Sequence, residues 1–246
     1  MKSVLQHIFE KKRDYARLPL FAHIRNPQLE PISRLGFYPA MAFFILSFGD
    51  LNKYLLRYEQ PKDPHEEMVN VHTFEDDHHW PWYLEDLTKL GFDNIVAGSD
   101  LLRFLWGDET KENRLLMYRM AALVEGTTGV ERLAIIEAIE ETGNVLFSAI
   151  LEPAKELETR YGIELRYCGM HHFERESGHS VGSDHKALAA MTLDDATRAR
   201  CMAHVDAVFM YFEAWTYELL RYAQAHTPHS VRAPKVAMRP ELGASA

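Results

Sequence analysis

The chain has 246 residues, of which 47% are hydrophobic and 26% charged, and this composition is sufficient for the packed core of a globular domain. The formal net charge of -9 argues against nucleic acid or an anionic membrane as a partner, because both are bound through clustered Lys and Arg side chains. Cys168 and Cys201 are too few for a disulfide framework, and the start of the chain has no apolar signal-peptide core, so we expect a cytoplasmic protein.

Nearly every long segment has the apolar period of an α-helix, and almost no alternating strand pattern is present. In chain order, helices are predicted over residues 38–60, 66–90, 97–106, 110–124, 130–159, about 165–178 and 193–226. The most apolar stretch, residues 37–48, is too short to span a bilayer, which takes roughly 20 apolar residues, and it predicts a buried core helix. We therefore expect an all-α, single-domain helical bundle of about seven or eight helices over residues 35–226. An N-terminal segment, 1–34, precedes it and a flexible tail, 227–246, follows it.

The histidines cluster in two windows, 72–79 and 171–185. In the first window, HTFEDDHH, the positions i, i+3, i+4 and i+7 share one face of a helix. The residues at these positions are His72, Glu75, Asp76 and His79. Imidazoles and carboxylates are the ligands that first-row transition metals take in proteins, so this face is a candidate half of a metal site. A solvated charged face is the alternative interpretation of the same stretch.

The second window repeats the form of the first. The pattern is His-x3-Asp-x2-His at 72–79 and His-x3-Glu-x2-His at 172–179, which puts His172, Glu176 and His179 on a shared face. The alternative interpretation is a surface loop interrupted by glycines. His171, His185 and the remaining histidines are predicted to be structural or at the surface.

A third stripe of polar side chains lies inside the apolar helix predicted over 130–159. It consists of Glu137, Glu140, Glu141 and Asn144. Buried carboxylates are costly unless cations neutralise them, although exposed helix glutamates would give the same pattern. Three helices that each turn carboxylates or imidazoles inward are how helical bundles build di-iron or di-manganese centres. Ligands at i and i+7 lie ~10.5 Å apart along a helix axis, which implies two ions, or a bend at Pro81.

The order Glu140, His172, Glu176 and His179 resembles the ligand pattern of the heme-oxygenase-like di-iron oxidases and oxygenases. That family has a glutamate on a central helix and, further along, a His-x3-Asp-x2-His triplet. Here Glu176 stands where the family has aspartate, which keeps the type of ligand.

An earlier helix in this family carries Glu-x6-His, with a Leu-Gly helix end about a dozen residues after the histidine. In this chain His79 takes the place of the histidine, and Leu90-Gly91 follows at the family's distance. His72 stands in place of the glutamate, so the resemblance implies either His72 or Glu75 as the ligand from this helix.

The resemblance covers about residues 35–225 and implies a heme-oxygenase-like (TenA/PqqC-like) fold. It also implies a non-heme di-iron oxidoreductase with two iron ions, manganese being the alternative metal, and with dioxygen as co-substrate. The substrate would be a small organic molecule, an external electron donor is a candidate partner, and a homodimer is compatible with the sequence. Neither nucleic acid nor a membrane is an expected partner. Members of one fold differ in substrate, so the resemblance does not choose the reaction.

Three alternatives stay open at this point. Ferritin-like di-iron proteins use Glu-x2-His motifs, which Glu75 with His78 and Glu176 with His179 would supply, but the shared helical face favours His79 over His78. A metal-free helical enzyme or a small-molecule-binding module of the same general fold is the second alternative. Heme binding through His23 is the third, although a lone histidine near apolar residues is usually structural.

Overall fold

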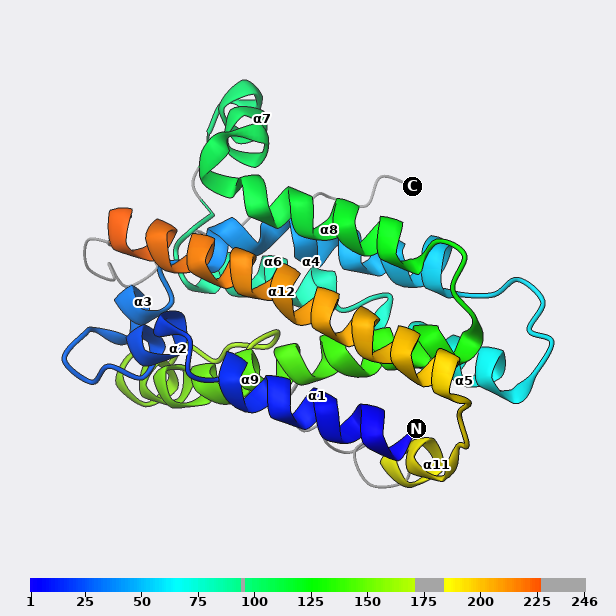
Figure 1. Ribbon diagram of the computed structural model, residues 1–246. Helices are drawn as coiled ribbons and strands as arrows, with labels where there is room; N and C mark the ends of the chain where they lie inside the picture. Colours follow the sequence, from blue (N-terminus) through cyan, green and yellow to red (C-terminus); the bar gives the residue numbers. More distant parts are fainter. Residues whose placement is uncertain (94–95, 171–183, 227–246) are drawn as a thin grey trace, which may run out of the picture.

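The computed structural model describes residues 1–93, 96–170 and 184–226, and none of these residues forms a strand. The prediction of an all-α chain is therefore confirmed for the described part, and the helices form a bundle. Figure 1 shows the long helices side by side, with helix α7 projecting from one end.

Two long helices, α9 (Gly129–Tyr161) and α12 (Asp195–Ala225), pack against each other in the centre of the bundle. The first contacts α5 (Pro64–Asp76), and the second contacts α8 (Lys111–Val124), which also packs on α4 (Ala42–Asp50). Most of α9 is buried, in agreement with its apolar sequence. This helix therefore passes through the core, and polar side chains along it lie inside the protein.

Residues 1–34, expected as a segment before the domain, form three helices: α1 (Lys2–Tyr15), α2 (Pro19–Ile24) and α3 (Pro31–Arg34). Val4 and Ile8 on α1 are fully buried, and α1 packs against both α9 and α12. The N-terminal residues thus contribute to the same core as the central helices (Figure 1).

The predicted helix at 38–60 is composed of three pieces: η1 (Tyr38–Met41), α4, and the π-helical η2 (Leu51–Leu56). Together with α3 they make a stretch, Pro31–Leu56, that could cross a membrane by length and composition alone. In its most apolar window, however, 61% of the residues are buried inside the bundle, as in the core helix of a globular protein.

A single helix over 66–90 is wrong. The chain forms α5, leaves the helix at residues 77–79, and begins again as α6 (Trp80–Lys89). Pro81 lies in the first turn of α6, where proline is favoured because its missing N–H would have no partner there. His72 therefore lies on α5 and His79 is the residue before α6, so the two do not share a helical face.

The remaining elements keep the predicted order of the helices at 97–106, 110–124, 130–159 and 193–226, with two further short elements between them. They are α7 (Gly98–Trp106), η3 (Asp108–Thr110), α8, α9, α11 (Asp184–Ala190) and α12. The helix predicted from about 165 is wrong for residues 165–169, which are not helical, and α11 has no counterpart in the predictions. The expected tail, 227–246, and most of the expected 165–178 helix lie outside the described residues.

Candidate functional site

A cavity of about 80 Å³ lies inside the bundle, against α4, α9 and α12 and the start of α6. Its walls are mainly apolar and aromatic; they include Phe44, Phe48, Leu146, Phe147, Phe212 and Trp215. A site for one water needs roughly 10–15 Å³ by this kind of measure, so the cavity has room for a small organic group. Pockets with apolar walls and a few polar groups are the usual form of small-molecule sites.

Asp76, His79 and Glu140 also line this cavity. The His79 ring is buried and stacks on Trp82, with 4.5 Å between ring centroids and an interplanar angle of 15°. Stacking fixes the plane of the imidazole. The wall of this mainly apolar cavity thus includes an imidazole and two carboxylates, supplied by α5, by the residue before α6, and by α9.

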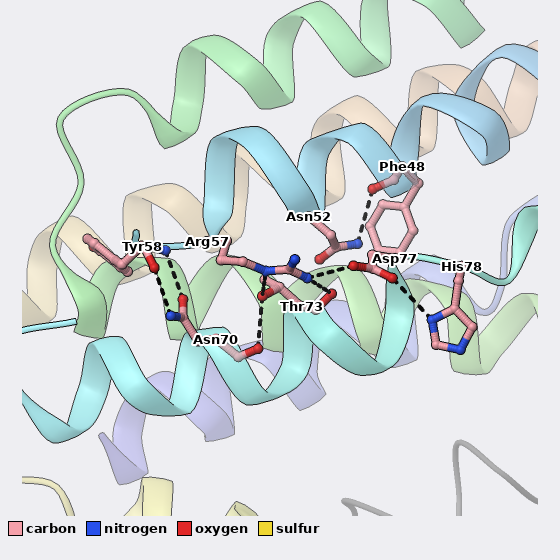
Figure 2. A network of polar contacts seen from close by, with 8 residues as sticks. All are labelled: Phe48, Asn52, Arg57, Tyr58, Asn70, Thr73, Asp77 and His78. Atoms are coloured by element: carbon pink, nitrogen blue, oxygen red, sulfur yellow. Dashed lines mark hydrogen bonds and ion pairs between the residues drawn. The ribbon is translucent and has the colours of Figure 1, made fainter. Parts of the chain in front are cut away.

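The break between α5 and α6 gives His79 its position. Figure 2 shows Arg57, at the end of η2, donating hydrogen bonds to the Thr73 carbonyl oxygen (2.7 Å), the Thr73 Oγ1 (3.1 Å) and the Asp77 carboxylate (2.7 Å). On the other side, a Cβ atom placed on Gly49 would meet the Asp77 carbonyl oxygen at 3.0 Å. The break is therefore held from both sides, and residue 79 is directed to the cavity rather than along α5.

The side chain of Asp77 titrates below its usual range. Burial by itself would raise the pKa of this carboxyl group, but hydrogen bonds from Arg57 and His78 outweigh burial and lower it. The break therefore includes a charged carboxylate at neutral pH, and this charge holds the Arg57 guanidinium in place.

The other predicted ligands are distributed as follows. His72 is half-buried on α5 and Glu75 is exposed, and neither is among the residues that line the cavity. Asp76, which the sequence puts on the same helical face, is the α5 residue in the wall. His172, Glu176 and His179 lie outside the described residues.

A second group of ligand-type side chains lies on α9 and α11. Oxygen atoms of Glu137 and Glu141 and a ring nitrogen of His185 all lie within 4.8 Å of one another. His185 Nε2 is hydrogen-bonded to Glu137 Oε1, and the Lys12 ammonium forms an ion pair with Glu141 Oε2. The hydrogen bond to Glu137 raises the pKa of His185 against the lowering effect of burial. The sequence indicated the two glutamates as part of a stripe but not His185, because α11 was not predicted.

The segment that leads into residues 171–183 is held by a buried carboxylate. Asp86 on α6 accepts hydrogen bonds from the backbone N–H groups of Arg166 (2.6 Å), Tyr167 (2.8 Å) and Cys168 (3.1 Å), and from the Tyr38 hydroxyl (2.8 Å). Since α6 begins next to His79, the same short helix fixes one wall residue of the cavity and the chain that precedes the second histidine window.

Both cysteines are buried and neither lines the cavity. Burial raises the pKa of Cys168 well above its usual value and raises that of Cys201 to about 11. A reactive thiol has a lowered pKa and access to solvent, so these cysteines have the properties of core residues. His23, the candidate heme ligand, is hydrogen-bonded to the Ser33 carbonyl oxygen and does not line the cavity.

The described side chains fit a transition-metal centre by donor type. Asp76, His79 and Glu140 line one cavity, and mixed imidazole and carboxylate sets suit iron and manganese. Comparison with known proteins adds no assignment, since no family model and no curated protein match the sequence.

Proposed function

We propose that the chain is a non-heme oxidase or oxygenase with two metal ions, iron or manganese, that uses dioxygen to oxidise a small organic substrate in the cavity. The observation that carries the proposal is that His79 and Glu140, far apart in the sequence, both line one apolar cavity. Asp76 joins them in the wall. The heme-oxygenase-like fold and the remaining ligands, His172, Glu176 and His179, are part of the proposal through the sequence resemblance.

The residues of the chain have separable roles in this proposal. Asp76, His79 and Glu140 would hold the metal from the described side of the site, with His72 or Glu75 as alternatives on the first helix. Reduced iron, when bound, supplies electrons to dioxygen. The aromatic walls bind the apolar part of the substrate and exclude water, which strengthens every electrostatic interaction in the site. Trp82 keeps the His79 ring in one plane, so the imidazole would need little reorganisation to hold a metal ion.

Metal content tests the proposal directly. The protein is loaded anaerobically with ferrous iron, desalted and analysed for iron. The part of the iron content that depends on His79 and Glu140 is expected to be close to two ions per chain. His79→Gln and Glu140→Gln should each lower the iron content, and His78→Gln is the matched control, because His78 is the neighbouring residue and its side chain is 51% exposed. Equal iron content in all three variants and the wild type would remove the assignment.

A metal-free enzyme or small-molecule-binding module is the second candidate, and the apolar cavity itself favours it. It predicts that ligand binding or activity persists in the presence of a strong chelator. The metal centre predicts that both are lost and return when iron is added. Neither cysteine can serve as a nucleophile in the cavity, so a metal-free reaction there would depend on Asp76, Glu140 and His79 as acid and base.

A further inference from the structure

Glu137 and Glu141 are four positions apart on α9, so they lie on one face of the helix. That face is directed toward α1, which supplies Lys12, and toward α11, which supplies His185. The cavity takes other α9 residues, among them Gly143 and Leu146. An α-helix turns about 100° per residue, which puts Leu146 on the side of α9 opposite Glu137. None of Glu137, Glu141 and His185 lines the cavity, so the group is distinct from it, although Glu140 in the cavity wall directly precedes Glu141 on α9.

Both carboxylates of this group are deeply buried, with 6% exposure for Glu137 and 3% for Glu141. Glu137 uses Oε1 for its contact with His185. Glu141 uses Oε2 for its contacts with both Lys12 and Asn144. Within the described part of the chain, Glu137 Oε2 and Glu141 Oε1 make no hydrogen bond or ion pair. Neither oxygen is fully enclosed by protein, so each side chain retains a coordination position that water or a further cation can take.

The charges in the group do not balance without another positive charge. The two carboxylates contribute two negative charges and Lys12 one positive charge, which leaves one negative charge when His185 is neutral. A proton on His185 or a bound metal ion can each supply the missing charge. The Lys12 side chain is 33% exposed, so its ammonium group can move into water when a metal ion takes its place beside Glu141.

From this geometry we propose that Glu137, Glu141 and His185 bind a divalent first-row transition metal ion that joins α9 to α11. Two carboxylates and one neutral imidazole are a three-ligand set that manganese, iron and zinc accept, with water in the remaining positions. Magnesium and calcium are disfavoured, because both prefer sets made only of oxygen ligands. The ion would fix α11 on the core at the point where the described chain resumes after residue 183.

A titration with Mn²⁺ tests the site, since electron paramagnetic resonance reports free Mn²⁺ and so gives the number of bound ions. Glu137→Gln and His185→Gln should each remove one bound ion per chain, or weaken its binding at least about 100-fold, because the effect of losing a ligand exceeds that of losing an outer partner. The matched control is His204→Gln, which changes a half-buried histidine of α12 outside the group. The same titration in a His79→Gln/Glu140→Gln background separates this ion from any ion in the cavity.

Lys12→Gln provides a test of opposite sign. It should tighten Mn²⁺ binding, because the ammonium group no longer competes for Glu141, whereas removal of a ligand weakens binding. Saturating Mn²⁺ should also raise the melting temperature of the wild type by about 5 °C and that of His185→Gln by much less. Circular dichroism of each variant without metal shows that it has folded.

The proposal is overturned if the Glu137→Gln and His185→Gln variants bind as many ions as the wild type with the same affinity. It is also overturned if Lys12→Gln leaves the affinity unchanged, which would mean that the group is a protonated ion-pair network. The cavity ligands remain intact in these variants. Neither result therefore bears on the proposed oxidase site, which is tested by its own iron analysis.

Discussion

Replacement of Asp86 by asparagine keeps the shape of the side chain, but it should still destabilise the protein strongly. One oxygen of Asp86 accepts the N–H of Arg166, and the other accepts the N–H groups of Tyr167 and Cys168 and the hydroxyl of Tyr38. All four partners are donors. An amide offers one acceptor oxygen and one NH2 donor group, so the variant must direct a donor at one or more donors in a fully buried place.

The magnitude follows from the better of the two amide orientations. With the amide oxygen toward Tyr38, Tyr167 and Cys168, one hydrogen bond is lost and the Arg166 N–H faces another donor. An unsatisfied buried group costs about 1–3 kcal/mol, and the remaining bonds lose their charge assistance. Burial is the main factor that raises the pKa of Asp86, so removal of its charge returns part of the loss. We expect a net loss of about 2–4 kcal/mol in the free energy of unfolding.

Urea unfolding followed by circular dichroism measures this loss, and Glu85→Gln is the matched control. Glu85 is the preceding residue on α6 and forms an exposed ion pair with Arg166, so its substitution should cost under about 1 kcal/mol. Equal losses in the two variants would refute the argument that Asp86 holds residues 166–168 through its acceptor geometry.

Three further predictions concern packing, capping and pH. Gly49→Ala should lower the unfolding free energy by about 1–3 kcal/mol, because its Cβ would meet the Asp77 carbonyl oxygen at 3.0 Å. Gly98 has open space around it, so Gly98→Ala should not lower the unfolding free energy in this way. Equal melting temperatures of the two variants would contradict the prediction. Thr128→Ala should cost about 1 kcal/mol by calorimetry, since Thr128 forms a capping box with Glu131 on α9, and Thr128→Ser should restore most of it. Burial raises the pKa of Glu131, but hydrogen bonds from Thr128 and from an arginine of α12 outweigh it, so the pKa is lowered overall. The contribution of the Glu131 charge to stability is therefore present above the ordinary pKa of about 4.3. This contribution is lost as the pH falls through the pKa of the folded protein. The stability difference between wild type and Glu131→Gln should therefore shrink from pH 6 to pH 3, and a constant difference would contradict this.

The sequence alone determined the helical class, the order of the long helices and most of their ends. Helical period is a local property, and α9 shows why its N-terminal end was predictable: Thr128 and Glu131 form the cap from residues three apart. The sequence also indicated His79 and Glu140 as a pair. The reason given for His79 was a helical face shared with His72, and this face does not exist because the helix is broken at 77–79. The N-terminal helix α1 was not predicted, although Val4 and Ile8 have the spacing of its buried face.

Only the tertiary structure decided which polar side chains meet. Asp76 enters the cavity wall and Glu75 does not, because the end of α5 is fixed by Arg57 and by the close approach of Gly49. The contact of His185 with Glu137 joins residues 48 positions apart. No local sequence pattern predicts this contact, since it depends on how α11 packs beside α9. That packing is set by the summed burial of apolar surface across the whole bundle.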